Sequence, residues 1–370
     1  MASLVYFLPA SREEGAEVLA AKVEQIYGAT KFQRLIGPDD FVGLKIHFGE
    51  KGNTGYIKPA WLKGLIQQVQ QKTKRAFFTD SNTLYVGQRS NAVDHLRLAA
   101  DHGFTYESTG LPVVIADGLL GADDEEVKVS GKRIQSAKIG RAILHSDALI
   151  ILSHFTGHVA TGLACAIKNL GMGCASRAGK LEQHSEVHPW VRAKVCINCG
   201  LCLDSCPAKA IIQVEGAAKI IDERCIGCGE CLVVCKVGAV KMRWDEDSRR
   251  VQEKMAEYAL AIRNYFGPKL VFLNFLLQIT KDCDCLARNQ SAVVEDIGIL
   301  ASFDPVAVDK ASVDLVLQKA GRDVLRQGYD LDWSIQLEYG ERVGLGFLEY
   351  DLQKIDFKPA LTADNSRWRE

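Results

Sequence analysis

A block of eight cysteines between Cys196 and Cys235 constrains this chain more than any other feature. The block contains two copies of the pattern C-x₂-C-x₂-C-x₃-C, at Cys196–Cys206 and at Cys225–Cys235. In this pattern three thiolates on a tight loop reach three irons of a cubane cluster, and the other copy supplies the fourth ligand. The spacing therefore predicts two 4Fe–4S clusters. Zinc bound by C-x₂-C pairs is the alternative, but two consecutive complete copies favour iron–sulfur clusters.

The exchange of the fourth ligand assigns each cysteine to a cluster. The expected ligands are Cys196, Cys199, Cys202 and Cys235 for the first cluster, and Cys225, Cys228, Cys231 and Cys206 for the second. The segment resembles a bacterial two-cluster ferredoxin. One departure is Lys236, which stands where the second copy usually has proline. A cation at this point would raise the potential of the first cluster relative to its neighbour.

Length, charge and cysteine usage limit the number of domains, the partners and the cellular compartment that we expect. At 370 residues the chain exceeds the usual size of one domain. A net charge of −1 gives no electrostatic reason to expect nucleic acid or an anionic membrane as a partner. The first residues lack the basic part of a signal peptide, and no apolar run reaches the roughly 20 residues that span a bilayer. Clustered cysteines at metal-ligand spacing are typical of a reducing compartment, so we expect a cytoplasmic protein.

Outside the cysteine block, strand-like and helix-like segments alternate. We expect strands at residues 4–8, 42–48, 76–79, 112–116, 148–152, 270–275 and 297–301. We expect helices at residues 11–27, 59–72, 91–102, 252–266 and 305–319, and one that begins near Ala160. This alternation predicts an α/β fold with a mostly parallel sheet and helices on both faces.

The α/β pattern stops at the cysteine block and resumes after it. We therefore predict one α/β domain from residues 1–186 and 246–370, with both parts in the same sheet. Residues 187–245 would form an inserted, small α+β ferredoxin-like domain, because insertions are tolerated where entry and exit lie close together. Three domains in line are the alternative, but the last would have few strands and little core of its own.

Polar residues follow several of the expected strands. These residues are Lys45, His47, Glu50, Asp80, Ser81, Asn82, His154, His158, Asn274 and Asp304. The carboxyl ends of parallel strands line one crevice of an open sheet, where ligands bind. The pattern therefore predicts a polar pocket. Helix capping is the alternative, and it fits Asp80 or Ser81 and also Asp304, which precedes Pro305.

The candidates for chemistry in this pocket fall into three groups. The catalytic candidates are Lys45, His47, His154 and His158, and the ligand- or cofactor-binding candidates are Asp80, Asn82, Lys168, Asn169 and Asn274. His154 and His158 would share a metal only if the turn between them is helical. Cys283 and Cys285, each next to an aspartate, form a third group that could bind a soft metal or reach a cluster. A buried or free thiol pair is the alternative for these two cysteines.

Four segments together resemble the domain-of-unknown-function 362 family. They are Lys45-Ile-His47-Phe-Gly-Glu50, Ser153-His154 with Gly157-His158, Lys168-Asn169-Leu-Gly-Met, and Asp296-Ile-Gly-Ile with Asp304-Pro305-Val-Ala-Val-Asp309. Members of this family often carry an inserted ferredoxin-like module and are named simply iron–sulfur centre proteins. The resemblance implies the insertion and the pocket, and it supplies no substrate.

Three functions remain open from the sequence. The chain has no P-loop, no dinucleotide-binding glycine pattern and no nucleophile elbow. We favour a redox protein whose clusters carry electrons to or from a small ligand or cofactor in the pocket, as in an oxidoreductase. The alternatives are a non-enzymatic electron carrier or regulatory iron–sulfur protein that docks a partner protein, and a metal-dependent enzyme with structural clusters.

Overall fold

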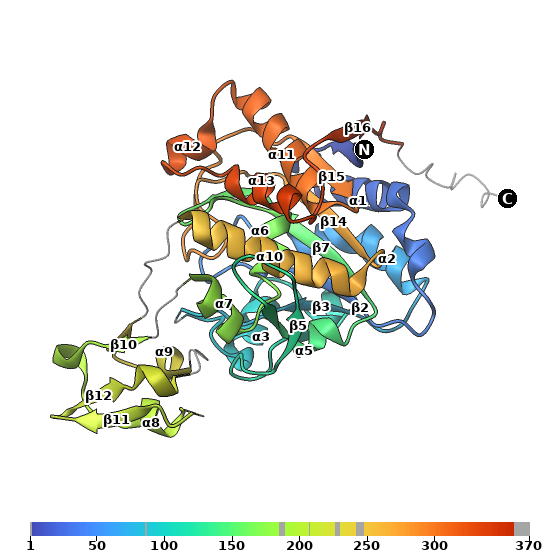
Figure 1. Cartoon of the computed structure of the whole chain (residues 1–370). Coiled ribbons are helices and arrows are strands. Elements are labelled where there is room, and N and C mark those ends of the chain that lie inside the picture. Colours follow the sequence, from blue (N-terminus) through green and yellow to red (C-terminus); the bar gives the residue numbers. More distant parts are fainter. Residues whose placement is uncertain are drawn as a thin grey trace.

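An eight-stranded sheet forms the centre of the molecule (Figure 1). Its strands are, in order across the sheet, β16 (Tyr350–Lys354), β1 (Ser3–Pro9), β15 (Gly298–Ser302), β14 (Leu270–Leu276), β7 (Ala148–His154), β2 (Val42–Ile46), β3 (Ala76–Asp80) and β4 (Val113–Ile115). The structure is a computed structural model that describes residues 2–85, 87–184, 189–206, 208–225, 230–241 and 248–358. Strand β15 runs antiparallel to both of its neighbours, and the other five pairs of adjacent strands are parallel. The expected mostly parallel sheet is confirmed.

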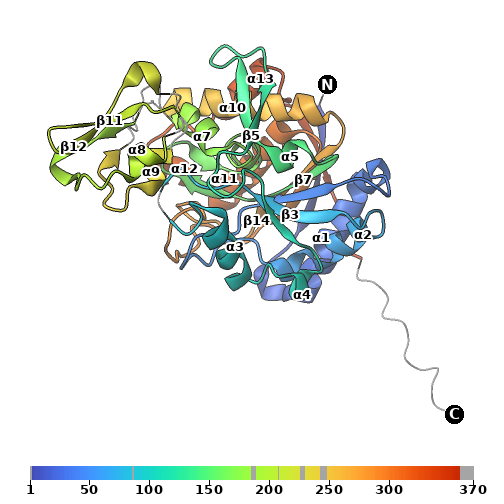
Figure 2. The same cartoon turned by 90° about the horizontal axis from the view of Figure 1, so that it is seen from below.

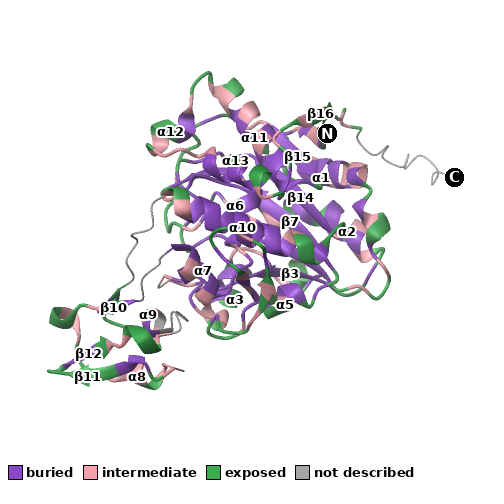
Figure 3. Cartoon of the chain, in the orientation of Figure 1, coloured by how far each residue is buried: buried purple, intermediate pink, exposed green. Residues whose placement is uncertain are grey.

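Helices cover both faces of this sheet, because its central strands are apolar on both sides. In β7, Leu149 and Ile151 join one core cluster, whereas Ile150 and Leu152 join the other. The helices of the first layer are α6 (Ala166–Gly171), α10 (Ser248–Phe266), α11 (Pro305–Ala320) and α13 (Ile335–Arg342), and those of the second are α1 (Ala16–Thr30) and α2 (Lys63–Gln70). Figure 3 shows the central strands and α10 as mostly buried. The α/β class with helices on both faces is therefore confirmed.

The α/β domain has further helices. They are α3 (Ala92–Asp101), α4 (Tyr106–Thr109), α5 (Arg141–Leu144), α7 (Arg177–His184) and α12 (Val324–Gly328). A hairpin of β5 (Asp124–Lys128) and β6 (Ser136–Gly140) has no counterpart among the expected strands. Among the described helices, none combines the length and the apolar character needed to cross a membrane.

The helix expected to begin near Ala160 is wrong. Strands β8 (Thr156–His158) and β9 (Gly162–Ala164) form a hairpin there, and α6 begins only at Ala166. Gly162 has a φ of +69°, which favours glycine, and a Cβ at this position would lie 3.0 Å from the Cβ of Trp333. The small apolar residues of this segment therefore make a tight, packed turn, although their composition suits a helix.

A small α+β unit lies beside the α/β domain and next to α7 (Figures 1 and 2). Its strands are β10 (Trp190–Val191), which pairs with β13 (Val240–Lys241), and β11 (Ile211–Val214), which pairs with β12 (Ala217–Ile220). Its helices are α8 (Leu201–Asp204) and α9 (Glu230–Val234). The large sheet takes strands from before and after this unit. The boundaries expected at residues 187 and 245 lie outside the described residues, so the division into domains stays a prediction.

Candidate functional site: a polar pocket and two groups of cysteines

A cavity of about 380 Å³ opens at the carboxyl ends of β2, β3 and β7. The candidates that line it are Lys45, His47, Asp80, His154, His158, Lys168, Asn169, Cys283 and Cys285. Two other candidates have structural roles. The side-chain amide of Asn82 donates to Asp117 at 2.9 Å, and that of Asn274 donates to Asp309 at 2.8 Å. Both asparagines are fully buried, so their expected role in ligand binding is not supported.

Asp304 lies on the side of the sheet where the amino ends of β2, β3 and β7 lie, opposite the pocket. Because β15 is antiparallel, the residues that follow it are far from the ends of β2, β3 and β7. Asp304 accepts hydrogen bonds from the backbone amides of Val306 and Ala307 at the start of α11. It is therefore a helix cap, as the alternative interpretation predicted, and not a pocket residue.

A buried ion-pair network forms the floor of the pocket. The Nζ of Lys45 lies 2.9 Å from Oδ1 of Asp80 and donates to Oδ1 of Asn169 at 2.7 Å. Arg89 lies 3.7 Å from Asp80 and 3.3 Å from Glu50. Burial would raise the pKa of Asp80, but the charges of Lys45, His95 and Arg89 together hold that pKa below its ordinary value. Lys45 and Asp80 therefore stabilise each other, and Asn169 fixes the lysine.

His47 is a neutral imidazole in this network. The backbone amide of Gly49 donates to its Nδ1 at 3.0 Å. Burial, followed by the positive charges of Arg89 and Lys168, holds the pKa of His47 well below its ordinary value. The ring can therefore donate or accept a hydrogen bond without carrying a charge.

His154 and His158 both line the cavity, but they do not meet the condition for sharing a metal, because they lie in strands and not on one helical turn. Nδ1 of His154 lies 2.9 Å from a carboxylate oxygen of Asp284, and its Nε2 lies 2.8 Å from the carbonyl oxygen of Leu277. Burial lowers the pKa of His154, but these partners outweigh it and leave the pKa above its ordinary value. His154 is thus a charged residue that anchors the segment around Asp284.

Replacing His154 by glutamine tests this charged pair. A histidine with a raised folded-state pKa stabilises the fold fully below its unfolded pKa, and the stabilisation is lost as pH rises through the folded-state pKa. We expect H154Q to lower the free energy of unfolding by about 1–3 kcal/mol near pH 6 and by less near pH 9. Urea denaturation at both pH values measures this difference. The control is H145Q, which removes an exposed histidine 2.8 Å from Glu125 and should change stability little at either pH. A loss in H154Q that is independent of pH would contradict a charged His154.

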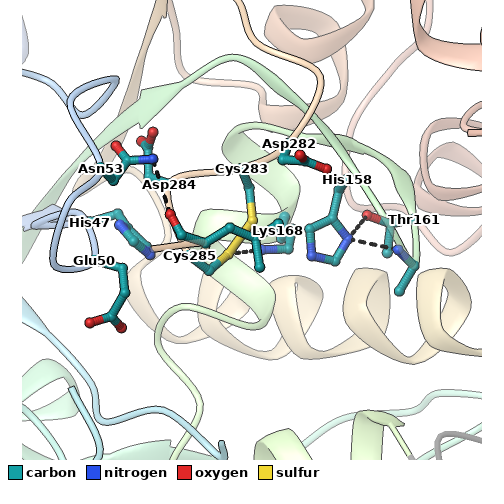
Figure 4. The surroundings of a disulfide bond; sticks show 12 residues. His47, Glu50, Asn53, His158, Thr161, Lys168, Asp282, Cys283, Asp284 and Cys285 are labelled. Carbon is teal, nitrogen blue, oxygen red and sulfur yellow. Dashed lines mark hydrogen bonds between the residues drawn. A yellow bond between two sulfur atoms is a disulfide. The ribbon is translucent and has the colours of Figure 1, made fainter. Parts of the chain in front are cut away.

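Cys283 and Cys285 form a disulfide that faces the pocket (Figure 4). The free thiol pair is therefore wrong for this structure. Nζ of Lys168 lies 3.9 Å from the sulfur of Cys285. A nitrogen of His158 and the two sulfurs lie within 4.8 Å of one another, so the three side chains could hold a metal ion. Metal ligation needs thiolates, so this would require the disulfide to be reduced first.

This disulfide contributes little to the stability of the chain. Its two cysteines are two positions apart, so it closes a loop of only three residues. The loop-closure relation gives a stabilisation of about 1.6 kcal/mol for such a loop, against about 3 kcal/mol for a loop of 15 residues. A structural role is thus a weak explanation for the bond.

Lys168 is the cation best placed to meet a ligand. It is half-buried and lines the cavity from the middle of α6. Burial, followed by the positive charges of Arg89 and Lys45, lowers the pKa of Lys168 to about 8. Unlike Lys45, it has no carboxylate within ion-pair distance among the described residues.

Three further pocket residues did not emerge from the sequence. Arg89, Lys180 and His184 line the cavity but follow no expected strand. Lys180 and His184 lie on α7, and Arg89 lies in the segment before α3. His184 is buried, and His188 lies outside the described residues. Only the folded arrangement brings these groups to the strand ends.

The four cysteines expected to bind the first cluster line one small cavity of the α+β unit. Burial, with the neighbouring thiols Cys196 and Cys235 adding to it, raises the pKa of Cys202. The amide of Ala239 donates to the sulfur of Cys235 at 3.0 Å, as backbone amides do around cluster ligands. Four sulfur atoms that line one cavity, one of which accepts a hydrogen bond from a backbone amide, are suited to ligate the irons of a cluster. In the second set, Cys228 lies outside the described residues.

The sheet and the pocket define an α/β protein with a polar site at its strand ends. The chain belongs to the family described as domain of unknown function DUF362, whose model matches residues 42–314. No curated protein matches the chain.

Two solved structures are similar to parts of the chain. One is the lactate racemase apoprotein from Thermoanaerobacterium thermosaccharolyticum, with 12% identity and a TM-score of 0.38 over 74% of this chain and 50% of that chain. The other is a protein from Thermotoga maritima, with 8% identity and a TM-score of 0.44 over 83% of this chain and 59% of that chain. The chain thus spans half to three fifths of the length of these proteins.

Proposed function

We propose that this chain is an iron–sulfur redox protein whose two 4Fe–4S clusters exchange electrons with an anionic small ligand or cofactor in the pocket. Two complete cysteine motifs and the gathering of four thiols around one cavity support the clusters. The first cluster would be held by Cys196, Cys199, Cys202 and Cys235, and the second by Cys225, Cys228, Cys231 and Cys206. Clusters of this kind supply electron transfer over a wide range of potentials. A redox partner protein would deliver or remove the electrons.

The observation that carries the proposal is the excess of cationic side chains in the lining, where Lys45, Arg89, Lys168 and Lys180 outnumber Asp80, Asp282 and Asp284. Positive neighbours contribute to a lowered pKa in three lining groups, namely His47, His158 and Lys168. An anionic group in the cavity would relieve this repulsion and raise the pKa of Lys168 again. The cavity volume of about 380 Å³ lies within the range of small-molecule sites.

A contact between the α+β unit and the wall of the pocket supports electron exchange between them. Leu232 of α9 packs against Leu84 and Leu181 of the α/β domain. Leu84 lines the pocket, and Leu232 directly follows Cys231, an expected ligand of the second cluster. The second cluster would therefore sit on the side of the unit that faces the pocket.

Replacing Lys168 by methionine tests the anionic ligand. A hydrogen bond to a charged group contributes about 1.5–3 kcal/mol, so K168M should weaken anion binding by at least about tenfold. Calorimetric titration with inorganic phosphate as a probe measures this change, and native mass spectrometry after anaerobic purification identifies any anion that the protein retains. The matched control is K281M, since Lys281 is exposed and lies over the ring of Tyr329. Equal binding of the probe by both variants would count against the proposal.

A further inference from the structure

We propose that the Cys283–Cys285 disulfide is a two-electron centre in the pocket, which the reduced iron–sulfur clusters convert to a dithiol. This inference rests on the proposed function, because the clusters supply the electrons. The disulfide lies in the same cavity as Leu84, the residue that contacts α9 next to Cys231. A bond that stabilises the chain little and faces a pocket is accessible to chemistry.

The loop that carries the disulfide is anchored at two points, one between the cysteines and one before them. Asp284, between the two cysteines, is held by His154. Asp282, before Cys283, accepts hydrogen bonds from Arg288 and Tyr329. The sulfur atoms can therefore separate or rejoin while the backbone around them keeps its place.

Two hydrogen-bond donors approach the sulfurs. Lys168 lies 3.9 Å from Cys285, and Figure 4 shows His158 with one ring nitrogen toward Thr161 and the other toward the disulfide. The amide of Ala160 donates to Nδ1 of His158 at 3.2 Å, so the hydrogen of the neutral ring is on Nε2. This N–H can stabilise a thiolate, whereas a metal would need a lone pair there. The hydrogen-bonding pattern therefore favours disulfide chemistry over a metal at this point.

The reduction balances with the groups present. The S–S bond of Cys283 and Cys285 would accept two electrons and break, and each reduced cluster would supply one of them and so return to its oxidised state. The ammonium of Lys168 gives one proton to Cys285, and water in the pocket gives the second proton to Cys283. Two thiols result, and water returns the proton to Lys168. His158 donates a hydrogen bond to sulfur and keeps its own proton.

An electron count under strictly anaerobic conditions tests the inference. Coulometric reduction of the whole protein should take about four electrons per chain, two for the clusters and two for the disulfide. The variant C283S/C285S should take about two. Labelling of thiols after denaturation, followed by peptide mass spectrometry, should find both Cys283 and Cys285 free in the reduced wild type. A wild type that takes about two electrons and keeps the disulfide would overturn the inference and leave the clusters standing.

Separate variants test the role of the clusters and the role of the hydrogen-bond donors Lys168 and His158. In C225A/C231A, which removes two expected ligands of the second cluster, the same one-electron donor should reduce the disulfide at least about tenfold more slowly, whereas a small dithiol should still reduce it. K168M and H158F keep the clusters and should also slow disulfide reduction by at least about tenfold, with unchanged cluster reduction. K281M should match the wild type. Unchanged disulfide reduction in K168M and H158F, or a metal ion bound by both thiols in the reduced protein, would contradict the inference. Absence of iron would instead contradict the proposed function itself.

Discussion

Replacing Cys199 and Cys202 together by alanine is expected to lower the iron content from about eight to about four atoms per chain. These two cysteines line the same cavity as Cys196 and Cys235, so their loss leaves the first cluster with two of its four expected ligands. The visible absorbance of the clusters should fall by about half. Iron and sulfide analysis after anaerobic purification measures the loss directly.

The matched control replaces two cysteines outside the motifs. Cys165 and Cys174 are buried in the α/β domain, so C165A/C174A should keep about eight irons per chain even if it loses some stability. Equal iron in both variants, or zinc in place of iron in the wild type, would show that the first ligand set is assigned wrongly.

The second large effect is expected at the floor of the pocket. Replacing Lys45 by methionine should lower the free energy of unfolding by about 3–5 kcal/mol, because it leaves the buried carboxylate of Asp80 without its nearest cation. The double variant K45M/D80N removes both charges and should recover part of that loss. Urea denaturation of the two variants measures both effects.

An exposed lysine provides the comparison. K310M breaks an ion pair at 2.6 Å with Asp314, but both partners are about one third exposed, so the loss should be at most about 1 kcal/mol. If K45M cost no more than K310M, or if D80N added its full cost to K45M, the buried pair would not hold the floor together. The Lys45–Asp80 ion pair would then not explain how the residues at the pocket floor are held in place.

The sequence predicted the central strands because each is a short apolar run between polar segments. In β7, every residue from Ala148 to Leu152 packs into a core, so the strand could be predicted from hydrophobicity alone. The direction of β15 was missed. Its connection from β14 contains no described helix, which is the signal for an antiparallel neighbour, since parallel neighbours need a long crossover. That direction moves Asp304 away from the pocket.

The pocket itself was predictable only in part. Lys45, Asp80 and His154 end parallel strands, and that position is enough to bring them together. Arg89 and Lys180 reach the same cavity from segments whose path depends on tertiary packing, so no local pattern could reveal them. The hydrogen bond from the amide of Asn274 to Asp309 of α11 could not be predicted, because a position near a strand end does not show which residue of a later helix lies beside it.

The most direct test of the central claim is to follow the oxidation state of the clusters while the pocket is altered. Wild type and K168M are reduced anaerobically and mixed rapidly with the small molecule that co-purifies with the wild type, and cluster absorbance is recorded. We expect cluster reoxidation in the wild type and a rate at least about tenfold lower in K168M at the same ligand concentration. Clusters that reoxidise at the same rate in both proteins, or that do not respond to the ligand, would contradict electron exchange with the pocket.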